Sequence, residues 1–166
     1  MNLEHYYWYF PSAVPLRVCD EIKTYGLQQR TQQGRTGDFD NYKSNLTPAE
    51  KKMRDSNILW MNDPWIYRQI YPFIGHANKA AGWNFKFDFP EAIQFTQYDI
   101  GQYYKWHCDA WTKSYNMPGK PNHGKVRKLS MTLSLSDPSE YEGGHLEFDL
   151  KSAHSPVEKK TTRVCT

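Results

Sequence analysis

Two side chains in this sequence have the types and spacing to bind one metal ion: His107 and Asp109, separated by Cys108. On a strand, residues two apart point to the same side, so the imidazole and the carboxylate can converge on one ion. These ligands suit Fe(II), and a site with His and carboxylate ligands on one face leaves other coordination positions open. The motif therefore predicts a strand-borne metal site, with Cys108 on the opposite face as a small core residue.

Three blocks occur in order around this pair: residues 98–109 (YDIGQYYKWHCD), 127–137 (RKLSMTLSLSD) and 141–148 (YEGGHLEF). A His-x-Asp tripeptide alone has little specificity. Together the blocks resemble the prolyl 4-hydroxylase-like branch of the 2-oxoglutarate- and Fe(II)-dependent dioxygenases, especially the PKHD-type hydroxylases of bacteria and phages. That branch has Tyr, Gly, Tyr and His-x-Asp at this spacing, then a strand, then a Gly-Gly-x-Leu-x-Phe strand.

The resemblance implies an enzyme that hydroxylates a C–H bond, with a prolyl or other amino-acyl side chain as the expected target. The substrate would be a peptide, a protein or a free amino acid. The cofactors would be Fe(II) and 2-oxoglutarate, with ascorbate as a candidate reductant.

The resemblance also implies roles for side chains near the metal. Tyr98 would bind the distal carboxylate of 2-oxoglutarate. Thr132 and Ser134 share the polar face of a predicted strand and are expected to border the cosubstrate pocket, unless that face is simply solvated. Trp106 and Trp111 flank the motif and are expected to shape the substrate entrance, with plain packing as the alternative.

Tyr104 is three residues before His107, so on a strand it would face away from the metal ligands. Core packing is therefore its expected role. Gly101 is expected to form a tight turn between two strands.

Two residues of the family pattern are not recognisable: the third metal ligand, a His on a later strand, and an Arg beyond it that pairs with the 2-oxoglutarate carboxylate. His154 is the best substitute for the ligand, and Arg163 matches the Arg poorly. Residues 149–166 provide roughly two strands, whereas a complete jelly roll needs about four more. We expect the chain to be truncated at its C-terminus.

The predicted fold class is α+β: a double-stranded β-helix (jelly roll) with N-terminal helices packed on one sheet. The interpretation is a single domain, residues 1–166, helical over about 1–82 and jelly-roll over about 83–166, with the last strands missing. Residues 10–26 are expected to form an entry loop and then a helix, capped by Ser12 and ended by Gly26, with an apolar stripe of Val14, Val18 and Ile22. A second helix is expected over residues 63–82, containing Pro72 and ended by Gly82. Strands are expected over residues 56–61, 83–89, 91–98, 101–109, 127–136, 145–150 and 161–165.

Composition narrows the class of protein. The net charge of +3 is spread out, with no basic run, so a nucleic-acid partner is not expected. No apolar stretch is long enough for a membrane span, and the N-terminus lacks the pattern of a signal peptide. Three widely spaced cysteines indicate reduced thiols and a cytoplasmic protein.

Two alternatives remain at this stage. One is a non-catalytic oxygenase-like fragment or binding module without the third ligand, whose open sheet edge could pair with a second copy. The other is a nucleic-acid-directed oxygenase of the alkylation-repair type, although no concentrated basic groove supports it.

Overall fold

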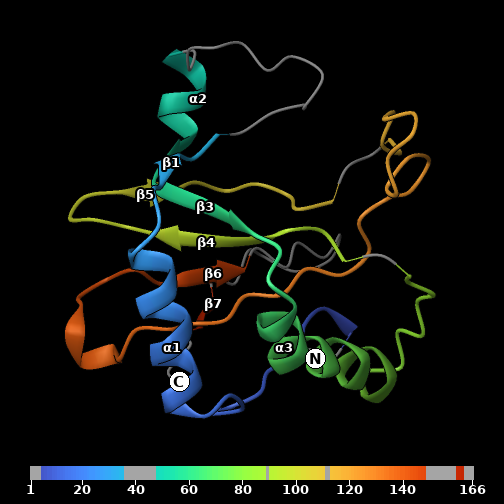
Figure 1. Cartoon of the computed structure of the whole chain (residues 1–166), viewed down its shortest axis with the longest axis horizontal. Helices are drawn as coiled ribbons and strands as arrows, with labels where there is room; N and C mark the ends of the chain where they lie inside the picture. The colour runs from blue at the N-terminus through green and yellow to red at the C-terminus, as the bar shows by residue number, and fades with distance from the viewer. Residues whose placement is uncertain (1–4, 36–47, 89, 111–112, 149–159, 163–166) are drawn as a thin grey trace. The chain divides into compact units, whose positions relative to one another are not determined.

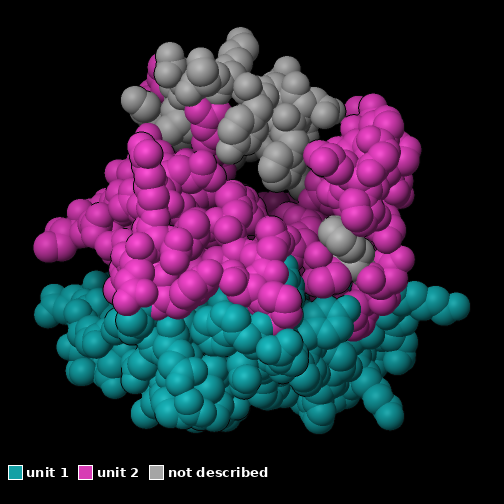
Figure 2. All heavy atoms as spheres, viewed as in Figure 1, with its two compact units in different colours: residues 1–24, 65–86, 131–166 teal, residues 25–64, 87–130 magenta. Residues whose placement is uncertain are grey.

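The computed structural model describes residues 5–35, 48–88, 90–110, 113–148 and 160–162. The chain forms two compact units, shown in different colours in Figure 2. Unit 1 comprises residues 1–24, 65–86 and 131–166, and unit 2 comprises residues 25–64 and 87–130. The predicted metal ligands belong to unit 2.

Unit 1 contains most of helix α1, Leu16–Leu27 (Figure 1). Its predicted apolar stripe is confirmed, since Val18 and Ile22 are buried. The predicted cap at Ser12 is wrong: the helix begins at Leu16, and Ser12 lies outside it with a φ of 49°. The carbonyl of Pro15 accepts the first amide bonds, because the chain turns into the helix only after this proline.

The second long helix, α3, runs from Pro64 to Ala80 with Pro72 inside it, as predicted. It buries Ile66 and Ile70. Its end at Gly82 is also confirmed, because Gly82 has a φ of 71° and its amide donates to the carbonyl of Lys79.

The strand predicted over residues 83–89 is wrong for its described part, residues 83–88. The side chain of Asn78 accepts from the amide of Phe85 and donates to the carbonyl of Phe85, each at 3.0 Å. Asn84 adopts a φ of 52°. The backbone groups that a strand would use are therefore bonded to a helix side chain, and the extended conformation is interrupted.

Unit 1 also contains an antiparallel pair of short strands, β6 (Leu146–Phe148) and β7 (Lys160–Thr162). Both fall where strands were expected. In contrast, residues 127–136 form no strand within the described part of the chain, so that prediction is wrong. Alternation of apolar and polar residues makes a strand possible, but a ladder also needs a neighbouring strand to bond with. The 3₁₀ turn Pro138–Glu140 follows, with Asp137 accepting from the amide of Ser139.

Unit 2 is built on a three-stranded antiparallel sheet with the order β1-β3-β4 (Figure 1). The strands are β1 (Gln32–Gln33), β3 (Asn57–Met61) and β4 (Ile93–Gln97), and Leu59 lies opposite Phe95. A Cβ on Gly26 would lie 2.7 Å from the Phe95 ring. Gly26 thus permits close packing inside α1, which continues to Leu27 and does not end at Gly26 as expected.

A short helix, α2 (Pro48–Met53), was not predicted and leads into β2 (Arg54–Asp55). Strand β2 pairs antiparallel with β5 (Tyr103–Tyr104), so Arg54 lies opposite Tyr104. The predicted turn before β5 is confirmed, because Gly101 has a φ of 80° and the amide of Gln102 donates to the carbonyl of Asp99.

The structure is therefore a mixture of helices and antiparallel strands. The jelly roll, the packing of helices on one sheet and the single-domain organisation stay predictions. None of the helices in the described residues has both the length and the apolar character that a membrane crossing requires.

Candidate metal-binding site

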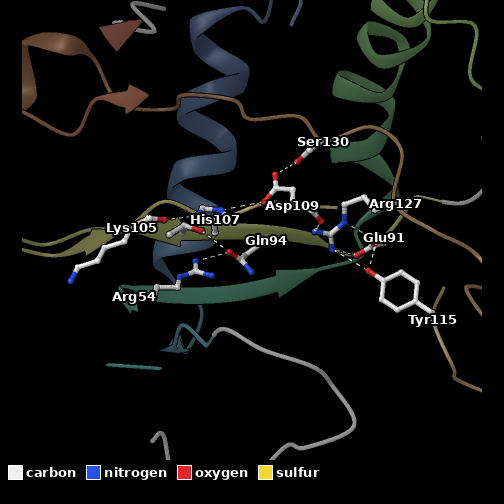
Figure 3. A network of polar contacts seen from close by, with 10 residues as sticks. Arg54, Glu91, Gln94, Lys105, His107, Asp109, Tyr115, Arg127 and Ser130 are labelled. Carbon is white, nitrogen blue, oxygen red and sulfur yellow. Dashed lines mark hydrogen bonds and ion pairs between the residues drawn. The ribbon is translucent and has the colours of Figure 1, made fainter. Parts of the chain in front are cut away.

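The two predicted ligands meet in the structure, although not on a strand. Strand β5 ends at Tyr104 and the chain bends at Trp106, so the prediction of a strand-borne motif is wrong. The Nε2 atom of His107 nevertheless lies 3.3 Å from Oδ1 of Asp109 (Figure 3). Two donor atoms about 2.1 Å from one metal, at right angles to each other, are about 3 Å apart. The pair therefore has the spacing of two neighbouring ligands of one ion.

The imidazole of His107 is oriented by its own backbone. Its Nδ1 lies 2.7 Å from the carbonyl oxygen of Lys105, which can only accept, so Nδ1 carries the hydrogen. The other nitrogen, Nε2, then faces a carboxylate oxygen. Two acceptor atoms this close repel each other unless a cation lies between them. That cation is either a proton on Nε2 or a metal ion that both atoms bind. A histidine fixed through Nδ1–H to a carbonyl is also the usual arrangement of a metal ligand.

The ring of Tyr104 stacks on that of His107, with centroids 3.5 Å apart and planes 11° from parallel. The expectation that Tyr104 packs in the core and faces away from His107 is wrong, because the bend at Trp106 interrupts strand alternation. Burial raises the pKa of the Tyr104 phenol. This stacking restricts the movement of the imidazole on one of its two faces.

Asp109 is held by two residues that the sequence reasoning did not single out. The hydroxyl of Ser130 donates to Oδ2 of Asp109, which leaves Oδ1 directed at His107. Arg127 donates from its Nη1 to the backbone carbonyl of Asp109 at 2.8 Å. Both residues lie in the second sequence block, and Ser130 precedes Thr132 and Ser134 in the same alternation, which was the available signal.

Arg127 is itself fixed by a forked ion pair (Figure 3). Its Nε and Nη2 donate to the two carboxylate oxygens of Glu91 at 3.0 and 2.5 Å, and the hydroxyl of Tyr115 also donates to Glu91. The hydrogen bonds to Glu91 raise the pKa of Arg127 well above its ordinary value. Glu91, Arg127 and Tyr115 form what we call the Arg127 clamp, which locates the backbone of Asp109.

A second arginine lies against the Tyr104 ring that stacks on His107. Arg54 is only 3% exposed, and its Nε and Nη2 donate to Ser56 and Gln94 at 2.7 and 2.6 Å. Its guanidinium lies 4.5 Å from the centroid of the Tyr104 ring. A Cβ on Gly34 would collide with Arg54 and Ser56, so glycine is needed there. No local sequence signal marked Arg54.

Tyr98, the predicted cosubstrate residue, follows β4 and is 49% exposed. Its hydroxyl is hydrogen-bonded to Arg54, and burial of the phenol raises the pKa of Tyr98. Trp106 is 51% exposed beside the ligand pair, where an entrance residue could lie, and that role stays a prediction. Cys108 is exposed, so its expected core position is wrong, because the bend removes the strand alternation on which it rested.

The described structure does not test the roles of the remaining predicted residues. Thr132 and Ser134 belong to unit 1, so their role at the cosubstrate pocket stays a prediction. Trp111, His154 and Arg163 lie outside the described residues. Within the described residues, no three His, Cys, Asp or Glu side chains gather at one point, so the described part of the chain brings together only the predicted ligands His107 and Asp109.

Comparison with known families places these residues in context. Residues 93–165, which include Tyr98, His107, Asp109 and Ser130, match the model of the 2OG-Fe(II) oxygenase superfamily. Comparison with curated proteins and with solved structures gave no significant match. The family match supports a 2-oxoglutarate- and Fe(II)-dependent oxygenase, hence an oxidoreductase, and the mixture of helices and antiparallel strands is compatible with that fold.

Proposed function

We propose that this chain is a dioxygenase that uses Fe(II) and 2-oxoglutarate to hydroxylate a C–H bond, in the prolyl 4-hydroxylase-like branch of the superfamily. The target is a prolyl or other amino-acyl side chain of a peptide, a protein or a free amino acid. The observation that carries the proposal is the 3.3 Å approach of His107 Nε2 and Asp109 Oδ1 inside the segment that matches the family.

The chain's own groups prepare the pair for a cation. Lys105 directs Nε2 of His107 through Nδ1, and Ser130 directs Oδ1 of Asp109 through Oδ2. His107 and Asp109 would hold Fe(II), which supplies the oxidation chemistry with 2-oxoglutarate and O₂ when bound. Trp106 would border the substrate entrance, and ascorbate would serve as reductant.

Titration with Mn(II), a redox-stable substitute for Fe(II), tests the pair directly. The wild-type chain should bind Mn(II), and His107→Ala should weaken binding at least about 100-fold by removing one ligand. His145→Ala is the matched control, because His145 is exposed and lies in the same matched segment. Equal affinity of wild type and His107→Ala would sink the proposal. Succinate release from 2-oxoglutarate with candidate prolyl peptides then tests the reaction.

One observation favours a non-catalytic binding module instead: the described residues gather only two ligands. In that case Mn(II) binding would be weak and unchanged by His107→Ala. The described ladders pair β4 with β3 alone, so its other edge could take a strand from a second copy. A concentration-dependent dimer in gel filtration, without metal binding, would support this second candidate.

We propose a cytoplasmic location from the cysteines. Cys19 is buried and Cys108 exposed, and both are free thiols. Exposed free thiols persist in a reducing compartment. Detection of the chain in a secreted fraction would contradict this location.

A further inference from the structure

The imidazole of His107 lies in a part of the chain that no strand holds in place. Strand β5 ends at Tyr104, and His107 follows the bend at Trp106. The side chain of His107 is 33% exposed, and its Nδ1 is bonded to the carbonyl oxygen of Lys105. This hydrogen bond fixes Nδ1, but the ring can still turn about the line from Nδ1 to the oxygen, and such a turn redirects Nε2. A second contact must fix the plane of the ring.

Tyr104 provides this second contact from the end of a strand. The rings of Tyr104 and His107 stack with centroids 3.5 Å apart and planes 11° from parallel, so a tilt of the imidazole would bring it into collision with the phenol ring. The backbone of Tyr104 is itself held by the antiparallel pairing of β5 with β2, in which Tyr104 lies opposite Arg54. The plane of the imidazole is thus tied to a residue that a strand ladder positions.

The second face of the Tyr104 ring is covered by Arg54, whose guanidinium carbon lies 4.5 Å from the ring centroid. The imidazole at 3.5 Å already fills one face, so the guanidinium lies on the other, where a cation is attracted to the aromatic ring. Arg54 is in turn bonded to Ser56 and Gln94 and is 3% exposed. The Tyr104 ring therefore has buried support on the side away from His107.

We propose that Tyr104 is a positioning residue of the metal site: its ring, supported by Arg54, holds the imidazole of His107 in the plane that directs Nε2 at the metal ion. The inference rests on the proposed function. A ligand that is already oriented loses less conformational freedom when the ion binds, so the stacking raises metal affinity although Tyr104 does not touch the ion. The support also extends the site to β2, which lies outside the segment 93–165 that matches the family.

Mn(II) titration of two variants isolates the contribution of the ring. Tyr104→Phe keeps the aromatic face and loses only the hydroxyl, so it should bind Mn(II) with wild-type affinity. Tyr104→Leu has no aromatic face, and its affinity should fall about 10-fold, the lower end for residues that orient a ligand. Tyr103→Leu is the matched control and should bind as wild type does, because it makes the same change one residue away, where the ring faces Lys105.

Proton NMR of the metal-free chain reads the orientation of the imidazole directly. Protons held over the face of an aromatic ring resonate upfield, so the carbon-bound imidazole protons of His107 should be shifted upfield in wild type and in Tyr104→Phe. In Tyr104→Leu the same signals should move downfield, toward the positions of an exposed histidine, while in Tyr103→Leu they should stay. Their absence from the spectrum of His107→Ala assigns them.

Arg54→Met tests the same contact from the other face of the ring, which keeps the test valid if Tyr104→Leu does not fold. The His107 signals should move part of the way downfield, and Mn(II) affinity should fall several-fold. Unchanged signals and affinity in a folded Tyr104→Leu or Arg54→Met chain would overturn the inference, as would an equal fall in affinity in Tyr104→Phe and Tyr104→Leu.

The wild-type chain separates this inference from the proposed function. If wild type binds Mn(II) but its His107 signals are not shifted upfield, the positioning role of Tyr104 is wrong while the metal site stands. If the signals are shifted upfield but wild type binds no Mn(II), the proposed function is wrong, and the positioning role fails with it.

Discussion

The two arginines of unit 2, Arg54 and Arg127, contrast in their surroundings. Arg127 is paired with Glu91, and Tyr115 donates a hydrogen bond to the same carboxylate. Arg54 is more deeply buried and bonded only to neutral groups within the described residues. Both touch the site, one through the backbone of Asp109 and the other through the ring of Tyr104.

The difference shows how an arginine that stabilises the fold can be distinguished from an arginine that supports a neighbouring side chain. A cation that is paired with an anion inside the protein stabilises the fold and needs no further partner. A cation buried without an anion costs desolvation energy that no ion pair offsets. Loss of the two arginines should therefore lower the free energy of unfolding to different extents.

The largest expected effect is on folding stability. Arg127→Met should lower the free energy of unfolding by about 2–3 kcal/mol, because it leaves Glu91 partly buried without its partner. Arg54→Met should change it by no more than about 1 kcal/mol, because removal of an unbalanced charge offsets the lost hydrogen bonds. Urea denaturation of both variants measures the contrast. Equal destabilisation would mean that Arg54 is as structural as Arg127.

A smaller effect is expected on metal affinity. Ser130→Ala removes the hydroxyl bonded to Oδ2 of Asp109, so the carboxylate loses its orientation. Mn(II) affinity should fall about 10-fold, the lower end for residues that orient a ligand. Ser139→Ala is the control, because that hydroxyl bonds Asp137 and no predicted ligand. If the two serine variants behave alike, Asp109 does not need this support.

The smallest effect concerns alkaline pH near Arg54. Burial raises the pKa of Tyr98 above its ordinary value of 10.0, so the folded chain keeps the phenolic proton to higher pH than the unfolded chain. Stability is unaffected below the ordinary pKa and falls as pH rises from 10.0 toward the raised value. Tyr98→Phe should reduce this alkaline loss.

Urea midpoints at about pH 8 and about pH 11 give the required comparison. An alkaline loss as large in Tyr98→Phe as in wild type would show that Tyr98 titrates alike in both states. The effect of burial on the pKa of Tyr98 would then be fully offset by Arg54, which lowers that pKa.

The strands show how much of the secondary structure the local sequence pattern predicts. The expected strands near β3, β4 and β6 are confirmed, whereas residues 83–88 and 127–136 alternate in the same way and form none in the described part of the chain. Alternation is a property of one segment, but a strand exists only when a second segment bonds to it. For residues 83–88, the side chain of Asn78 takes those backbone groups instead.

The sequence by itself determined the proximity of His107 and Asp109, because a spacing of two keeps the two side chains close in an extended or a bent chain. It also determined helix α3, whose end signal at Gly82 is local. Only the tertiary structure decided which groups support the pair. Arg54, Tyr104 and Ser130 act through contacts with residues distant in sequence or across a bend, and no spacing rule encodes such contacts.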